Sequence, residues 1–289
     1  MMNKWLLFPL FFVSVGGFTV DWPLKSAVMI NNFGKSDRGL PMLGDTFQGD
    51  GIVGAIEDGE LVFTGGVNMP AARFTSPLGN MAALDHGDGL VSIYSRMGAS
   101  YTERQKQVKA AGPVGSAGIS GWSSTSGFYL SIFDKKERRW VNPSLIIPVL
   151  PDTRPPFIHS VRLKNNAGEI IDLATVRTIR QGSYTIIVHT EDTRLNPAGP
   201  LLMPMRIICS IDGAEAGYLA FETFSARDGV LMLFRNGFVP VSEVYSYAPA
   251  VEAGEVFFNR GRVTLEIIVQ DSTESRANSR SAVYSLFVE

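Results

Sequence analysis

The sequence predicts an all-β protein made of two domains, and three observations lead to this fold class. The first half of the chain carries short apolar runs separated by glycine, a pattern typical of short strands joined by tight turns. The second half alternates apolar and polar residues at strand length, and neither half contains a long amphipathic helix. A chain of 289 residues is also long enough for two domains that each bury a core.

The first domain is expected to occupy residues 21–148. Its candidate strands are the apolar runs Gly51–Phe63, Met81–Tyr94 and Phe128–Phe133, with turn signals at Asp58-Gly59 and Asp88-Gly89. A proline-rich segment then follows, and proline removes the backbone donors that sheet pairing needs. We therefore place a linker at residues 149–156 and expect few contacts to cross it, so that each half folds alone.

The second domain, residues 157–289, is predicted to be a β-sandwich of about seven strands. The candidate strands are Ile158–Leu163, Tyr184–His189, Met205–Ile211, Val230–Phe234, Val263–Val269 and Val283–Val288. Turn signals at Asp212-Gly213 and Asp228-Gly229 separate some of them. Cys209 is the only cysteine, so the disulfide of antibody domains is absent.

The N-terminus has the composition of an export signal over residues 1–20. Lys4 precedes an apolar run from Trp5 to Val15 that ends in two glycines and is too short for a spanning helix. An uncleaved anchor and a buried first strand are the alternatives. We expect a protein exported to the periplasm or cell envelope of a bacterium, without a membrane span after signal removal. Because 26 basic residues balance 28 acidic ones without a basic cluster, nucleic acid is not an expected partner.

Four segments of the first domain resemble, in order and spacing, the lysostaphin-type (LytM) peptidoglycan endopeptidases. Ile52–Phe63 resembles the family's strand pair V-x-A-x-x-D-G-x-V, Gly79–Tyr94 its D-H-G-x-G hairpin, Val108–Gly118 its V-K-x-G-x-x-I-G-x-x-G stretch, and Ser126–Phe133 with Val141–Pro143 its closing G-x-H-L-H-F-E and V-x-P. The resemblance implies a LytM-like β-sheet domain. The second domain resembles the immunoglobulin-like sandwiches often attached to such peptidases.

The same alignment implies that the family's zinc site is degenerate. The family takes ligands from an early H-x-x-x-D and from the second histidine of the late H-x-H. Asp45 fills the carboxylate position, but Leu40 or Pro41 stands where the first histidine belongs. Tyr129 and Ser131 replace both late histidines, and Arg96 occupies the position of the catalytic histidine in Y-x-H. We expect Asp45, Arg96, Tyr129 and Ser131 to converge on one cleft that binds a ligand without cutting it.

A single aspartate cannot hold zinc against water, and tyrosine or serine is a poor substitute for imidazole, so we expect no metal cofactor. His86 matches a hairpin histidine outside the family's metal set, and His159 and His189 are interpreted as sheet-surface or packing residues. Gly34-Lys35-Ser36 lacks the upstream glycine of a phosphate loop.

Three functions stay open. The first is a non-catalytic envelope protein that binds peptidoglycan, or an envelope protein such as a cell-wall hydrolase, through the degenerate cleft. The second is a zinc-dependent peptidoglycan metalloendopeptidase whose ligands align differently. The third is a structural or adhesive envelope protein, in which the cleft has filled in and binds nothing.

Overall fold

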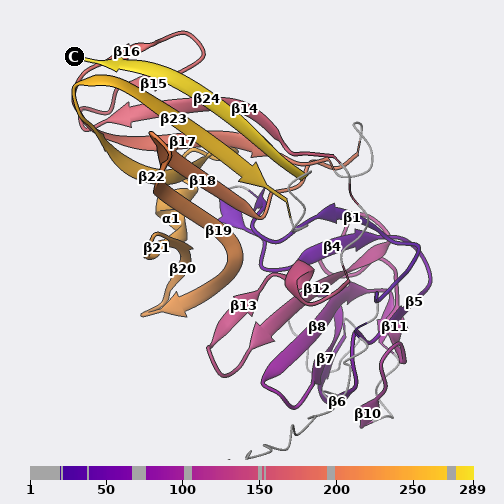
Figure 1. The fold of residues 1–289 in the computed structure, drawn as a ribbon. Helices are drawn as coiled ribbons and strands as arrows, with labels where there is room; N and C mark the ends of the chain where they lie inside the picture. Colours follow the sequence, from indigo (N-terminus) through magenta and orange to yellow (C-terminus); the bar gives the residue numbers. More distant parts are fainter. Residues whose placement is uncertain are drawn as a thin grey trace, which may run out of the picture.

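The computed structural model describes residues 20, 22–37, 39–66, 76–100, 106–148, 152, 154–193, 199–271 and 278–289. This part of the chain is nearly all β, with one short helix, α1 (Val241–Val244), and a 3-10 turn at Pro143–Leu145 (Figure 1). Neither helical segment has the apolar length that a bilayer span requires. The predicted export signal, apart from Val20, and residues 149–151 and 153 of the predicted linker lie outside the described residues.

The first domain is built on one antiparallel sheet and a small second sheet. Its strands are β1 (Val28–Asn31), β2 (Ser36–Asp37), β3 (Leu40–Pro41), β4 (Asp45–Gln48), β5 (Ile52–Gly54), β6 (Gly59–Gly65), β7 (Asn80–Asp85), β8 (Leu90–Met97), β9 (Ala99–Ser100), β10 (Gln107–Val108), β11 (Pro113–Ser116), β12 (Gly127–Asp134) and β13 (Arg139–Val141). The main sheet runs β10-β6-β7-β8-β12, and β12 then pairs with β4 along its first half and with β13 along its second. The small sheet has the order β5-β11-β9.

Of the two hairpin turns predicted in this domain, one is found in the structure and the other is not. Asp88-Gly89 lies in the turn of the antiparallel β7–β8 hairpin, as the sequence predicts, and Gly89 has φ of 109°. Asp58-Gly59 does not close a hairpin, because β5 pairs with β11 in the small sheet while β6 pairs with β7 and β10 in the main one. The apolar run Ile52–Phe63 therefore crosses from one sheet to the other, and the first core fills the space between them.

The second domain is a sandwich of two sheets. Its strands are β14 (Phe157–Asn165), β15 (Ile170–Asp172), β16 (Thr178–Ile179), β17 (Gly182–Glu191), β18 (Arg206–Ile211), β19 (Ala214–Arg227), β20 (Val230–Arg235), β21 (Phe238–Pro240), β22 (Val251–Phe258), β23 (Gly261–Gln270) and β24 (Ser279–Val288). One sheet has the order β15-β14-β17-β22, and the facing sheet contains β19-β18-β23-β24-β16. Alternate residues of both sheets bury a single core between them.

The sequence-based strand list for this domain omitted the short strands β15, β16 and β21 and the long strands β19 and β22. The start of β19 contains only small and charged residues up to Gly217, and β22 carries Glu252 and Glu255 among its apolar residues. Glu252 is buried, yet its carboxylate faces Arg235 at 3.4 Å. A partner on a distant strand thus makes a charged residue acceptable in a buried strand, and local alternation cannot reveal such a partner.

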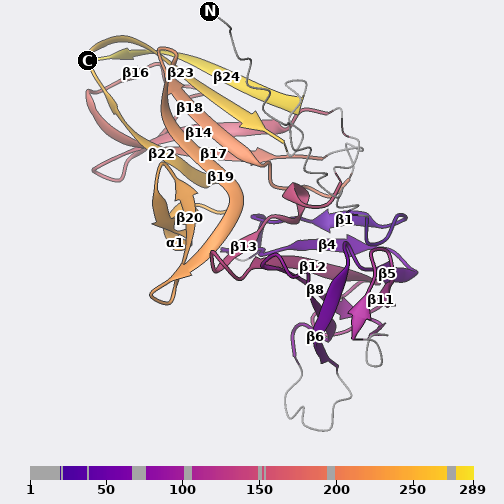
Figure 2. The ribbon, with the colours of Figure 1, turned by 60° about the horizontal axis from the view of Figure 1, so that its bottom comes forward.

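One hydrogen-bonded sheet runs through both domains. β13 of the first domain pairs antiparallel with the second half of β19, with Trp140 opposite Phe224. The first half of β19 pairs with β18 inside the sandwich. Figure 2 shows β19 curving out of the sandwich to reach β13. Backbone donors and acceptors of both domains therefore satisfy one another at the junction.

Two apolar side chains also cross the junction in opposite directions. Phe33, which precedes β2, is fully buried in the core of the second domain, where its ring centre lies 4.9 Å from that of Phe224. Leu202, which precedes β18, is buried in the core of the first domain. Asn32 holds the crossing segments together, because its Nδ2 donates to the Met203 carbonyl at 2.7 Å and its Oδ1 accepts from the Met203 N–H at 2.8 Å.

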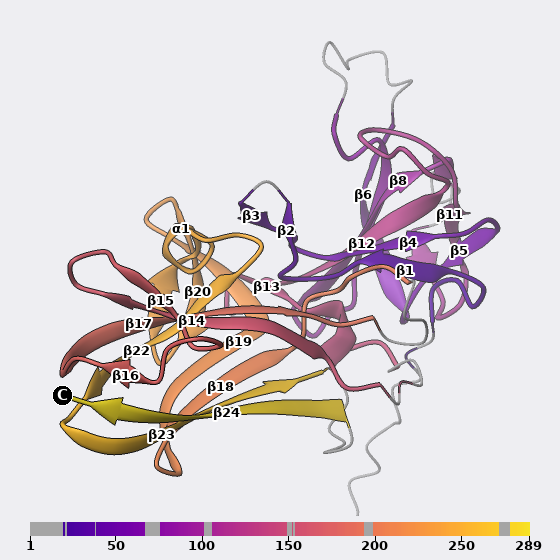
Figure 3. The same ribbon diagram turned by 90° about the horizontal axis from the view of Figure 1, so that it is seen from above.

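The segment after Phe33 is shaped to fit against the second domain. Gly34 has φ of 81°, and a Cβ built there would lie 2.9 Å from Cδ1 of Phe221. The Tyr245 hydroxyl donates to the Gly34 carbonyl. In Figure 3 the β2–β3 hairpin projects from the first domain toward the region of α1. Only glycine meets both the conformation and the close approach at this position.

These contacts differ from the expectation that few would cross the linker. The two cores are distinct, but each contains a residue from the other domain, and a strand ladder joins them. The linker itself gives no sign of this, because the crossing residues lie far from it in sequence. Truncation after residue 151 would expose Phe33 and the edge of β13.

We predict that Phe33→Ala lowers the free energy of unfolding by about 3–5 kcal/mol, the cost of emptying a buried phenylalanine site. Phe257→Ala is the matched control, because Phe257 is 55% exposed, and it should change stability by no more than about 0.5 kcal/mol. Denaturant unfolding followed by circular dichroism measures both values. Equal effects of the two substitutions would show that Phe33 does not bridge the domains.

Candidate functional site

The structure places Tyr129 and Ser131 on one strand, Arg96 against the Tyr129 ring, and Asp45 on the neighbouring strand β4. Tyr129 and Ser131 lie on β12, on the strand face opposite Leu130, whose side chain is buried in the first core. β4 pairs with this part of β12 and places Asp45 opposite Leu130. The guanidinium carbon of Arg96, near the end of β8, lies 5.0 Å from the centre of the Tyr129 ring.

Gly44 places the chain directly over these side chains. A Cβ built on Gly44 would lie 2.9 Å from Cβ of Ser131, 2.9 Å from Cζ of Tyr129 and 2.2 Å from the Leu130 carbonyl oxygen. The backbone before Asp45 therefore covers Tyr129 and Ser131, and no larger residue fits there. Tyr129 is only 8% exposed and Ser131 only 4% exposed.

Asp45 holds the segment that crosses into the second domain. Its side chain is fully buried, and Oδ1 accepts a hydrogen bond from the Phe33 N–H at 2.8 Å. A buried carboxylate requires such donors, because leaving an ion in an apolar interior without them is costly. The Asp45 carboxylate thus fixes Phe33, whose ring packs in the core of the second domain.

Tyr129 is a neutral phenol in this environment. Burial is the main cause that raises the pKa of Tyr129, and the nearby charge of Asp45 raises it further. The charge of Arg96 and a hydrogen bond with the Leu43 backbone act in the opposite direction. Since the pKa lies above its usual range, Tyr129 is protonated near neutral pH.

Arg96 supplies the cation of the cluster. It is half-buried, has φ of 58°, and donates its N–H to the Leu78 carbonyl at 2.6 Å. Its Nε is buried and makes no hydrogen bond among the described residues. Contact with the face of the Tyr129 ring stabilises the guanidinium in this position.

These residues do not fit a zinc ion. Zinc in a catalytic site needs three protein donors, usually imidazole, thiolate or carboxylate. Asp45 is the only such donor among the four residues. The chain has three histidines. Of these, His86 bonds the Asp58 carbonyl through Nδ1 at 2.8 Å and Ser92 Oγ through Nε2 at 2.9 Å, which ties the β7–β8 hairpin to the start of β6.

Sequence reasoning did not anticipate two other clusters of potential ligands. His159, His189 and Glu191 lie together on β14 and β17, with ligand atoms within 4.8 Å of one another. The carboxylates of Asp152, Asp192 and Asp271 also lie within 4.8 Å of one another, and each of these residues makes further contacts. Only the i, i+2 spacing of His189 and Glu191 is visible in the sequence.

Comparisons with known proteins give two kinds of result. A protein-family model matches residues 155–289, the stretch that forms the second domain, whereas no curated protein matches the chain. Among solved structures, the chain is similar to the catalytic domain of the prophage-encoded M23 protein EnpA from Enterococcus faecalis, with 20% identity over 40% of this chain and 87% of that chain and a TM-score of 0.35.

Two further solved structures are similar to the chain. The SpoIIQ–SpoIIIAH pore-forming complex gives 18% identity over 45% of this chain and 91% of that chain, with a TM-score of 0.37. The catalytic domain of lysostaphin from Staphylococcus simulans gives 21% identity over 37% of this chain and 78% of that chain, with a TM-score of 0.31. At such identities we transfer no residue role. The chain is a nearly all-β protein with lysostaphin-type domains among its structural neighbours.

Proposed function

We propose that this chain is a non-catalytic exported envelope protein. In it, a lysostaphin-type domain without zinc ligands is joined to an immunoglobulin-like sandwich, and the pair binds peptidoglycan or holds an envelope partner such as a cell-wall hydrolase. The four motifs in family order support the assignment of the first domain as lysostaphin-type. The two facing sheets of the second domain support its assignment as an immunoglobulin-like sandwich.

The observation that carries the non-catalytic role is the hydrogen bond from the Phe33 N–H to the buried Asp45 carboxylate. A catalytic zinc site keeps an open position for water, whereas here Gly44 and its neighbours cover the site. The carboxylate stabilises the contact between domains in place of a metal. The strand ladder and the crossing side chains join the two domains, an arrangement that suits a scaffold.

Arg96 is the residue of this site that we expect to contact a ligand. The stem peptides of peptidoglycan carry carboxylates, and a guanidinium binds a carboxylate through paired hydrogen bonds. Arg96 is the least buried of the four residues, since Asp45, Tyr129 and Ser131 are all buried. A ligand therefore approaches the rim of the covered site and does not enter it.

Purified protein incubated with cross-linked peptidoglycan and added zinc should leave the cross-links intact. The reason is that the site offers one carboxylate where hydrolysis requires a metal with an activated water. Mass spectrometry of the muropeptides gives the readout, with an active lysostaphin-type enzyme as the positive control. Cleavage that Asp45→Ala abolishes would instead identify a zinc metalloendopeptidase.

For binding, we predict that Arg96→Ala weakens retention on insoluble peptidoglycan roughly tenfold or more, the scale of one charge-assisted hydrogen bond. Arg262→Ala, which removes an exposed arginine on β23, should leave retention unchanged. A co-sedimentation assay measures both. If wild-type protein sediments and Arg96→Ala sediments equally well, the ligand does not contact this site.

A further inference from the structure

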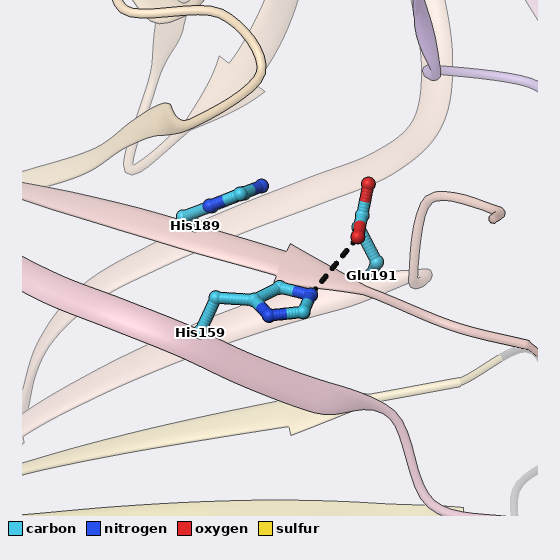
Figure 4. Close-up of side chains that lie close together, drawn as sticks. All are labelled: His159, His189 and Glu191. Carbon is cyan, nitrogen blue, oxygen red and sulfur yellow. Dashed lines mark hydrogen bonds and ion pairs between the residues drawn. The ribbon is translucent and has the colours of Figure 1, made fainter.

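A cluster of two imidazoles and one carboxylate lies on the outer face of the β15-β14-β17-β22 sheet (Figure 4). His189 and Glu191 project from β17, and His159 projects from the neighbouring β14. The ring centres of the two histidines are 4.7 Å apart, and His159 Nε2 lies 2.9 Å from Glu191 Oε2. None of these residues belongs to the site in the first domain.

A β-bulge brings His159 to this face. In the ladder between β14 and β17, Ile158 pairs with Thr190 and Ser160 pairs with His189, so His159 is the extra residue. Ile158 and Val161 both pack on the core, which leaves His159 and Ser160 to face outward together. Without the bulge, strict alternation would turn His159 toward the core.

One nitrogen of this cluster has no partner in the described structure. His189 Nε2 is buried and makes no hydrogen bond, although polar atoms in such positions are normally bonded. A neutral imidazole with a free lone pair is the form that binds a metal.

We propose that His159, His189 and Glu191 form a binding site for zinc in the second domain. Two imidazoles and a carboxylate are a donor set typical of zinc with one coordination position open. Ligand atoms around tetrahedral zinc lie roughly 3.4 Å apart, as bond lengths of about 2.0–2.1 Å require. The three atoms here, within 4.8 Å of one another, reach that spacing by small side-chain rotations.

Two cations face the cluster and limit its affinity. Arg162 acts on His189, and Lys35, from the first domain, acts on Glu191. Their repulsion opposes a bound cation, so the site should bind zinc less tightly than a structural zinc site does. His159 is exposed, which leaves the open position accessible to water or to a donor from a partner molecule.

Zinc titration of the full-length protein against a chromophoric chelator tests the proposal. Wild-type protein should bind about one zinc per chain. His159→Ala, His189→Ala and Glu191→Gln should each lower the affinity by more than about a hundredfold, beyond the roughly 10–100-fold effect of losing an outer-sphere partner. Arg162→Gln should raise the affinity a few-fold, a gain that a purely structural cluster would not produce. Thermal melts of each variant verify folding.

His86→Gln and Asp45→Asn are the controls, because they alter a histidine and a carboxylate of the first domain. Both should bind zinc like the wild type. No saturable binding, or binding that survives both His159→Ala and His189→Ala, would overturn the proposal. Zinc lost only in Asp45→Asn would place the metal in the first domain, and would contradict the non-catalytic function as well as this proposal.

Discussion

The hydrogen bond between the Asp45 carboxylate and the Phe33 amide is the interaction on which the domain arrangement depends. The chain leaves β1, inserts Phe33 into the core of the second domain, and returns through Gly44 to β4. A fully buried carboxylate needs a donor, and a buried amide needs an acceptor. The Asp45 carboxylate and the Phe33 amide satisfy each other where the segment between β1 and β4 leaves the first domain. This hydrogen bond fixes where Phe33 enters the second domain.

The path of the segment between β1 and β4 also explains why Tyr129 and Ser131 are buried. Because Phe33 is held in the second domain, the returning backbone must pass close above β12, and Gly44 is the residue that allows this. Tyr129 and Ser131 are then buried beneath the chain. The burial of Tyr129 and Ser131 and the formation of the domain junction are therefore two aspects of one arrangement, in which the Asp45 carboxylate acts as a hydrogen-bond acceptor.

Local patterns in the sequence predict the parts of the fold that local physics determines. Asp88-Gly89 predicts the β7–β8 hairpin because the turn itself requires those residues. The all-β class follows from short apolar runs in the same way. The aligned motifs predict that Asp45, Tyr129 and Ser131 share a cleft, and the structure pairs β4 with β12. Their role in ligand binding stays a prediction.

Long-range features could not be predicted in this way. Nothing near Phe33 indicates that it packs on Phe224, and β19 reaches β13 through pairing with another domain. The cluster around His159 depends on one bulge, and a shift of register by one residue would separate its members. These features arise from tertiary contacts that periodicity does not record.

Hydrogen exchange of the Phe33 amide, measured by NMR, tests the central role of Asp45 most directly. The amide should be strongly protected in the wild type and in Asp45→Asn, which keeps an acceptor oxygen, and it should lose most of its protection in Asp45→Ala. Rapid exchange in the wild type, or protection unchanged by Asp45→Ala, would show that Asp45 does not hold the crossing segment.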